Sequence, residues 1–228
     1  HFLEHMLFKG SERRSAEDVN REFDEMGANY NAFTSEENTV YYGHVLPEFQ
    51  PRLIDLLTDM MRPALRSDDF DMEKNVILEE IALYQDRPTY IAYEKARRIF
   101  FGEHPLGNTV LGTTESISAL HRDQMAEYHA RRYAPNNLTL VLTGAYDWEQ
   151  AVAQARALSR SWTPAEVSRD TRPSHPASGV HVETTDKFNR VQLLLLAPGV
   201  AAQSPERSVA EIVAAALGGS EGSRLYWA

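Results

Sequence analysis

The chain alternates between stretches in which apolar residues recur at helical spacing and shorter stretches in which apolar and polar residues alternate. The helical spacing predicts helices over 1–9, 15–26, 47–61, 67–86, 89–101, 116–133, 148–158 and 205–217. The alternation predicts strands over 28–34, 39–45, 138–143, 180–184 and 190–196, the first two forming a hairpin across the polar residues 35–38. Because strands and helices do not follow a regular βαβ order, we expect an α+β fold with a mainly antiparallel sheet flanked by helices.

A change in composition divides this pattern. Residues 163–179 contain three prolines and three serines without apolar periodicity, which predicts a linker. We therefore expect a first α/β unit over 1–162, the linker over 163–179, and the truncated beginning of a second unit over 180–228. The chain also opens inside a motif without a start methionine, so we expect a fragment whose targeting signals cannot be judged.

The composition narrows the classes of function. The 228 residues carry a formal net charge of -10, and this acidic balance argues against a nucleic-acid partner, which normally meets a basic face. The sequence has no cysteine, which excludes a disulfide scaffold and a cysteine-ligated zinc, so a metal would be held by His, Asp or Glu. The longest apolar run, 191–200, is far shorter than the roughly 20 residues of a membrane-spanning helix, and we expect a soluble protein.

The first five residues carry a candidate for metal chemistry. His1 and His5 are four positions apart, so on a helix their rings project from nearly the same face, one turn apart. Two imidazoles placed in this way can bind one Zn²⁺, and Glu4 projects beside them without needing to be a ligand. The order H-x-x-E-H is the inverted form of the H-E-x-x-H zinc motif. A catalytic zinc needs a third protein ligand, which must come from elsewhere in the chain.

The predicted helix over 67–86 supplies candidates for that third ligand. On a helical wheel its apolar residues gather in one arc, made of Val76, Ile77, Leu83 and Tyr84. Glu80 falls in the middle of this arc, Glu73 falls within it, and Glu79 lies off its edge. A carboxylate on a core-facing stripe is costly unless it is paired, protonated or bound to a metal. We therefore predict that Glu80 is the ligand, Glu73 an auxiliary carboxylate or an arginine's ion-pair partner, and Glu79 a solvated residue.

Several motifs together resemble one known family. The segment HFLEHMLFKG (1–10) resembles the signature of the M16 metallopeptidases, the family of pitrilysin, insulinase and the mitochondrial processing peptidase. The segment EKNVILEEI (73–81) is similar to the helix that carries the family's distal glutamate, and the gap from His5 suits the family's spacing. GANYNAFT (27–34) resembles the strand beside the zinc. Later segments resemble the family's following loops and strand, namely HPLG (104–107), VLGTTESI (110–117) and YAPNN (133–137).

This resemblance implies a fold, a reaction and a site. It implies a LuxS/metallohydrolase-like M16 α/β unit that lacks its first strands, followed by the start of a similar unit. His1, His5 and Glu80 would bind one Zn²⁺, Glu4 would be the general base for the attacking water that zinc activates, and Glu73 would assist. The activity would be that of a zinc metalloendopeptidase acting on unfolded peptides. An extended peptide substrate would pair with four strand residues, Asn31, Ala32, Phe33 and Thr34.

The resemblance also implies a partner. A catalytic M16 half closes against a companion half, which could be fused, a second copy or a separate chain, and which usually supplies an arginine and a tyrosine to the site. Arg224 and Tyr226 lie too close together in the sequence to match that pair. The natural substrate is not indicated, and the compartment stays open between the bacterial cytoplasm and the periplasm.

Two other functions remain as alternatives. A non-catalytic M16-like subunit, acting in binding or assembly, would typically have lost a site residue, whereas His1, Glu4, His5 and Glu80 are all present. A structural zinc module would not need an acidic residue placed to act as a base. The remaining histidines show no ligand spacing and are expected to be surface or core residues, namely His44, His104, His121, His129, His175 and His181.

Overall fold

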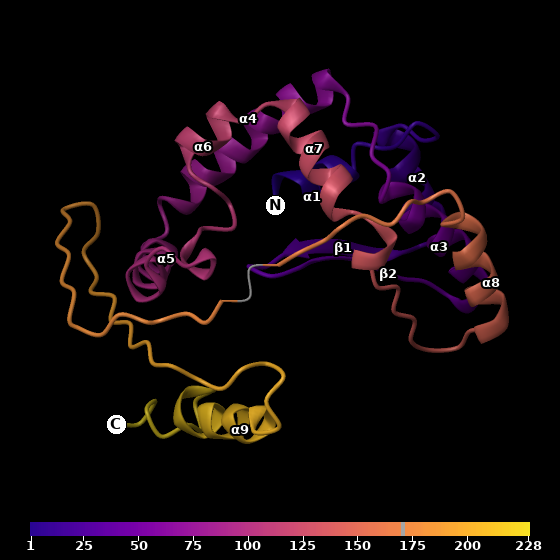
Figure 1. The fold of residues 1–228 in the computed structure, drawn as a ribbon. Helices are drawn as coiled ribbons and strands as arrows, with labels where there is room; N and C mark the ends of the chain where they lie inside the picture. Colours follow the sequence, from indigo (N-terminus) through magenta and orange to yellow (C-terminus); the bar gives the residue numbers. More distant parts are fainter. Residues whose placement is uncertain (170–171) are drawn as a thin grey trace.

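Helices and one β-hairpin make up the regular structure of the computed structural model, which describes residues 1–169 and 172–228 (Figure 1). Within these residues the α-helices are α1 (Phe2–Leu7), α2 (Ala16–Glu25), α3 (Gln50–Met60), α4 (Ser67–Tyr84), α5 (Pro88–Phe101), α6 (Thr114–Ala119), α7 (Arg122–Arg132), α8 (Trp148–Leu158) and α9 (Arg207–Gly218). The short 3-10 helices are η1 (Pro47–Phe49), η2 (Pro105–Gly107) and η3 (Pro135–Asn137), and the strands are β1 (Asn29–Thr34) and β2 (Thr39–His44). The mixed α+β class predicted from the sequence is confirmed.

The hairpin of β1 and β2 forms as predicted, to within a residue at each outer end. The strands pair antiparallel, from Asn29 opposite His44 to Thr34 opposite Thr39 at the turn. Along β1 every second residue is half-buried and the residues between are exposed, which is the two-residue period of a strand with one covered face. On β2, a side chain at Gly43 would lie 2.8 Å from a methyl group of Leu53, so the glycine lets α3 pack closely on the hairpin.

Two apolar clusters hold the helices together. In the first, α1 packs on α4, and the rings of Phe2 and Phe70 stack with their centroids 4.8 Å apart. The second lies between α2, α3 and the hairpin, where the Phe23 ring stacks on Tyr30. The fully or nearly fully buried members of the first cluster are Phe2, Leu3, Met6, Leu7, Leu65, Phe70, Ile77, Ile81, Leu111, Ile117 and Met125. Those of the second are Val19, Phe23, Met26, Leu53, Leu56 and Met60.

The turn after α1 depends on a glycine and an arginine. Gly10 has a φ of +93°, and a Cβ there would meet the carbonyl oxygen of Arg14 at 2.2 Å, so only glycine fits. The guanidinium of Arg14, whose side chain is largely buried, then pairs with Glu22 (2.8 Å), Asp55 (2.5 Å) and Asp59 (3.0 Å). These contacts tie the turn to α2 and α3, so the C-terminal end of α1 is held on a rigid base.

The single helix predicted over 116–133 is two helices. The first, α6, starts earlier than predicted because Thr113 and Ser116 form a capping box at its N-terminus. Leu120 is extended, with ψ at 138°, and ends this helix. His121 and Gln124 then cap a second helix, α7. Apolar spacing continues across the break, and this is why periodicity alone predicted one helix.

The strands predicted over 138–143, 180–184 and 190–196 are not formed in the part of the chain that the structure describes. These segments keep the alternating apolar pattern, but many of their aliphatic side chains are exposed, as Val180 (91%), Val191 (93%) and Leu193 (82%) illustrate. A strand requires a neighbour for its main-chain hydrogen bonds, and none of the described segments pairs with them. The predicted linker includes residues 170 and 171, which lie outside the described residues, and the division into two units stays a prediction.

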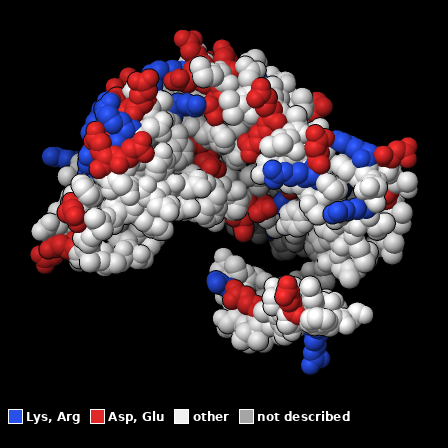
Figure 2. Space-filling view, turned by 180° about the vertical axis from the view of Figure 1, so that it is seen from behind, with Lys and Arg blue, Asp and Glu red and all other residues white. Residues whose placement is uncertain are grey.

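Residues 172–228 contact the body of the molecule at α5 and at the end of α4. Ala177 donates a main-chain hydrogen bond to Phe100 (2.9 Å), and Lys187 reaches Asp86 (2.7 Å). Figure 2 shows acidic and basic side chains interspersed over the body, and the segment with α9 below it. Among the described residues, no helix has both the length and the apolar character that crossing a bilayer would require.

Candidate metal centre

The candidate site lies where α1 meets α4 and β1. Figure 1 shows α1 between the helices of the upper layer and the hairpin beneath it. Packing of the apolar residues of α1 fixes the rotation of this short helix, and His1, as its N-cap, and His5 then both face Glu80 of α4. Glu4, on the same helix, is 8% exposed and lies toward the hairpin.

Three predicted ligands converge. The Nε2 atoms of His1 and His5 lie 3.7 and 3.9 Å from Oε2 of Glu80, and the two rings are 4.6 Å apart. One donor atom from each of the three residues lies within 4.8 Å of the others. Across residues 1–169 and 172–228, no other group of three or more His, Cys, Asp or Glu side chains meets this criterion.

The three side chains fit a zinc ion. Two imidazoles and one carboxylate are a known ligand set of catalytic zinc, with a fourth position left for water or substrate. A tetrahedral zinc holds its donors about 3.3–3.4 Å apart, so the two separations from Glu80 (3.7 and 3.9 Å) need only a small contraction. Among the described residues, the buried Nδ1 atom of His1 has no hydrogen-bond partner.

Glu73 lies behind His5, on the side away from Glu80. Its Oε1 accepts a hydrogen bond from Nδ1 of His5 (2.8 Å), and its Oε2 forms an ion pair with the Lys9 ammonium (2.5 Å). Burial raises the pKa of Glu73, but Lys9 and His5 outweigh this and hold the pKa below its ordinary value. The predicted ion pair of Glu73 therefore exists, but with a lysine rather than an arginine.

The buried face of α4 is narrower than the helical wheel predicted. Val76 and Leu83 are 43% and 55% exposed, whereas Ile77 and Ile81 are buried. The core stripe runs through Glu73, Ile77 and Ile81 at four-residue spacing, because α1 covers only that strip of the helix. Glu73 is thus the carboxylate inside the core stripe. Glu80 lies at its margin with a partly exposed side chain, and Glu79 is exposed as predicted.

Glu4 is held by the hairpin. Thr34, at the end of β1, donates a hydrogen bond from Oγ1 to Oε2 of Glu4. Thr39, directly across on β2, has its hydroxyl 3.2 Å from that of Thr34. Beyond them lie Tyr41 and Tyr133, whose hydroxyls are 3.0 Å apart. Burial raises the pKa of both tyrosines, and the charge of Glu4 adds to each rise, so this polar cluster lies within electrostatic reach of Glu4.

The four predicted substrate residues of β1 are divided between its two faces. Asn31 joins Glu4 and His5 in lining a cavity of about 340 Å³, and Thr34 contacts Glu4. Phe33 is 50% exposed and does not line this cavity. The main-chain N–H of Ala32 donates to the side chain of Asn31 (2.8 Å), so a peptide that pairs there would replace this bond. The rest of the cavity lining is Phe8, Lys9, Asn20, Tyr30 and Glu73.

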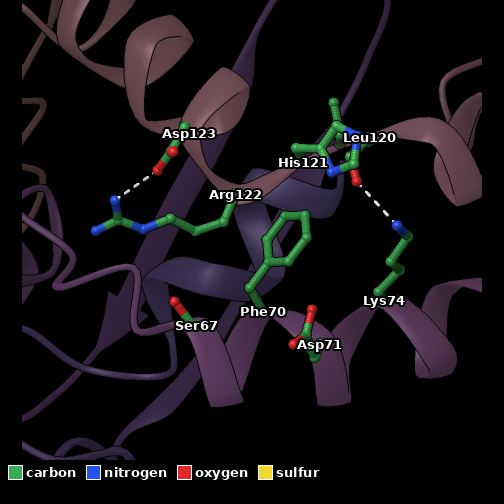
Figure 3. Close-up of a pocket in the computed structure, with 8 residues that line it drawn as sticks. All are labelled: Ser67, Phe70, Asp71, Lys74, Leu120, His121, Arg122 and Asp123. Carbon is green, nitrogen blue, oxygen red and sulfur yellow. Dashed lines mark hydrogen bonds and ion pairs between the residues drawn. The ribbon is translucent and has the colours of Figure 1, made fainter.

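A second hollow of about 290 Å³ lies away from these residues, at the first turns of α4 and α7. Figure 3 shows Phe70 at its centre, with Lys74 bonded to the carbonyl of Leu120 and Arg122 bonded to Asp123. These cations already have partners, and none of the predicted site residues lines the hollow. We therefore place the candidate site at the first cavity.

The sequence pattern did not identify two contacts of the site. Lys9 pairs with Glu73, and it lies four positions after His5, a spacing that often puts two side chains on one side of a helix. The bond from Thr34 to Glu4 joins residues 30 positions apart, and no periodicity can predict it.

Comparison with known proteins decides the family. Residues 1–114 match the family model described as insulinase (peptidase family M16), and residues 119–228 match the model described as the peptidase M16 inactive domain. The chain belongs to the M16 peptidase family. All residues of the candidate metal centre lie within the first matched range.

Curated relatives are similar along nearly the whole chain. An uncharacterized zinc protease of Streptomyces coelicolor is 34% identical over 99% of this chain and 51% of its own length. One of Mycobacterium tuberculosis is also 34% identical, over 99% of this chain and 53% of its own length. The chain therefore spans about half the length of these relatives.

Solved structures share the M16 fold. A peptidase M16 inactive domain from Pseudomonas fluorescens superposes with a TM-score of 0.82 at 20% identity, over 98% of this chain and 55% of the other. A putative M16-like peptidase from Alicyclobacillus acidocaldarius superposes with a TM-score of 0.65 at 29% identity, over 73% of this chain and 38% of the other. The fold predicted from the sequence motifs is thus found in M16 structures.

Proposed function

We propose that this chain carries the catalytic half-site of a zinc endopeptidase that hydrolyses unfolded peptides. The observation that carries the proposal is the convergence of His1, His5 and Glu80 with Glu4 beside them. The zinc-protease names of the M16 relatives support the same reaction. A purely structural zinc module would have no use for a buried carboxylate next to its ligands.

Each residue of the centre has a distinct task in this proposal. His1, His5 and Glu80 would hold one zinc ion, which when bound polarises the scissile carbonyl and lowers the pKa of water toward ~7. Glu73 accepts the Nδ1 hydrogen of His5, which leaves Nε2 of that ring free to face Glu80. Glu73 is therefore a positioning residue, because it touches a ligand rather than the reacting atoms.

Glu4 is the general base. Its position beside His5 allows its carboxylate to take a proton from the attacking water and to return it to the departing amine. Burial of this side chain, which is 8% exposed, keeps bulk water away from the proton that it carries. The reaction therefore needs no other titratable group for the proton transfer.

The substrate would bind as an extended strand along β1. In the described residues β1 pairs only with β2, so its other edge can accept main-chain hydrogen bonds. Asn31 and the adjoining cavity would receive one substrate side chain. Strand pairing requires an exposed, extended segment, so we propose unfolded peptides rather than folded proteins as substrates.

A companion M16 half would complete the enzyme. The chain spans about half the length of its curated relatives, and residues 119–228 match the M16 inactive domain. In the described structure the candidate centre lies at a surface of the chain, with His5 and Glu80 each about a quarter exposed. A second half closing over this surface would exclude water.

The test is turnover of a quenched fluorescent peptide by the natural full-length protein, with and without a chelator, beside Glu4→Gln. We expect cleavage that the chelator abolishes and that Glu4→Gln lowers by roughly 10²- to 10⁴-fold, the usual contribution of a general base. Zinc content, measured by atomic absorption, should stay the same in this variant. Glu79→Gln, on the exposed side of α4, is the matched control and should cleave normally. Undiminished cleavage by Glu4→Gln would rule out this mechanism.

A non-catalytic role in binding or assembly is the second candidate. The observation that favours it is the match of residues 119–228 to a model described as an inactive domain. The candidate centre, however, lies entirely within residues 1–114. Stoichiometric zinc without peptide cleavage, in the presence of every candidate companion chain, would support this role against the peptidase.

A further inference from the structure

We infer that Thr34 is a positioning residue for Glu4, and that Thr39 supports it through a directed hydrogen-bond chain. In this arrangement the side chain of Thr34 serves the base instead of contacting the substrate. The inference rests on the proposed function, in which Glu4 is the base. It changes the role that the sequence pattern suggested for Thr34.

The two oxygens of Glu4 have different surroundings. Oε2 accepts the hydrogen of the Thr34 hydroxyl. Among the side chains and main chain that the structure describes, no hydrogen bond engages Oε1. A carboxylate that is tethered at one oxygen cannot rotate freely, so the other oxygen keeps one direction. Thr34 thereby leaves Oε1 as the atom that takes the proton.

The direction of the chain follows from counting hydrogens. A carboxylate only accepts, so the single hydroxyl hydrogen of Thr34 is committed to Glu4. In the contact between the hydroxyls of Thr34 and Thr39 (3.2 Å), Thr39 must then be the donor. The bonds run from Thr39 to Thr34 to Glu4. Removing Thr39 would leave the Thr34 oxygen without this donor but would not break the bond to Glu4.

The hairpin turn that holds Thr34 and Thr39 is fixed by contacts that do not involve a substrate. Thr34 and Thr39 form the last pair of the hairpin, and Ser35 closes the turn with a main-chain hydrogen bond to Asn38 (2.8 Å). Arg97 of α5, which is 5% exposed, pairs with Glu36 in the same turn (2.7 Å). The hydroxyl of Thr34 is therefore held in place before a peptide arrives.

The alternation of β1 separates this role from substrate binding. Thr34 is on the half-buried face of the strand, whereas Asn31 and Phe33 are on the exposed face. A peptide that adds to the strand edge meets main-chain groups, which every residue type provides. Substitution of the Thr34 side chain should therefore act on the chemical step and leave binding nearly unchanged.

The first experiment compares Thr34→Val and Thr34→Ser in the full-length protein. We expect Thr34→Val to lower kcat by roughly 10- to 100-fold, the effect of losing a hydrogen bond to a charged group, with KM within about twofold of wild type. Zinc content should be unchanged, and Thr34→Ser, which keeps the hydroxyl, should recover most of kcat. Thr89→Val, at an exposed threonine of α5, is the control. A raised KM with normal kcat, or a loss of zinc, would overturn the inference.

The second experiment tests the chain itself. Thr39→Val should lower kcat less than Thr34→Val does, and it should have no further effect when Thr34 is already valine. Independent, multiplicative effects of the two substitutions would contradict a chain that passes through Thr34.

A third measurement does not depend on activity. Urea unfolding of the metal-free protein should show a coupling between Thr34→Val and Glu4→Met, because each substitution removes the same bond. Absence of coupling would refute the contact even if the enzyme is active. Normal coupling in a protein that cleaves no peptide would instead reject the proposed function and leave the contact between Thr34 and Glu4 standing.

Discussion

Residues 1–133 and residues 172–228 have similar apolar patterns but very different burial. In the first region Ile77 is completely buried, whereas in the second Leu193 and Val180 are 82% and 91% exposed. Ser223 is the only buried residue among 172–228. An apolar pattern thus states which face of a segment can be buried, but burial also requires a neighbour whose shape and hydrogen-bonding groups match.

The candidate site belongs wholly to the buried region. Each of its side chains is placed by packing: α1 on α4 for the histidines and Glu80, and the hairpin for Glu4. A metal site and a general base must keep their atoms within about 0.5 Å of the productive positions, and this requires side chains that are fixed by packing. The exposed region supplies none of the candidate residues, so the two regions should respond very differently to substitution.

The largest expected effect concerns the metal. Glu80→Gln should lower zinc affinity by more than roughly 100-fold, because a neutral amide is a poor third ligand. Loss of a residue that only hydrogen-bonds to a zinc ligand can already cost about that much. Competition with a chromophoric chelator measures this affinity. Glu79→Gln, on the exposed side of α4, should bind zinc normally. Normal zinc affinity in Glu80→Gln would move the third ligand to Glu79 or Glu73.

The next effect contrasts the two regions directly. Ile77→Ala should destabilise the fold by about 2–5 kcal/mol, because it removes a fully buried side chain between α1 and α4. Leu193→Ala should change the unfolding free energy by less than about 0.5 kcal/mol, as for other surface positions. Urea unfolding measures both. If Leu193→Ala cost as much as Ile77→Ala, the second region would be buried in solution, and the contrast would fail.

The smallest effect concerns pH. Burial lowers the pKa of His129 below its ordinary value of 6.5, and its Nε2 donates a hydrogen bond to the Met61 carbonyl (3.0 Å). Below about pH 6.5 the unfolded chain therefore binds a proton that the folded chain does not, so stability falls as the pH falls toward 5. His129→Gln should reduce this loss in urea unfolding at pH 7 and pH 5. The same substitution at the exposed His181 is the control, and equal slopes in the two variants would reject the assignment.

Local signals predicted much of the first region. The helix predicted over 15–26, the polar turn of 35–38 and the helical spacing of 67–86 all appear in the structure close to where the sequence predicts them. Each of these signals is contained within a few neighbouring residues. The convergence of His1, His5 and Glu80 was predicted from the spacing of the two histidines and from the place of Glu80 on the helical wheel of 67–86, and the family resemblance implied the same three ligands.

What the sequence did not predict depends on contacts between distant residues. The helical wheel of α4 treated Val76 and Leu83 as core, since it could not show that α1 covers only a narrow strip. The strand predictions after residue 137 were wrong in the described structure because a strand also needs a partner, which its own alternation cannot supply. Lys9 beside Glu73 is a third case, since the pair joins the turn after α1 to α4.

The hairpin turn has a consequence for how this sequence can change. Thr34 and Thr39 face each other across the four residues 35–38, and side chains of a strand change face with every position. Inserting one residue before Thr34 in β1 would turn its hydroxyl from Glu4 toward solvent, although the hairpin could still pair. A surface loop normally tolerates insertions and deletions, but here such a change would leave a protein that folds and no longer cleaves peptides. The number of residues in this part of the hairpin should therefore be under selection for activity, whichever residues occupy it.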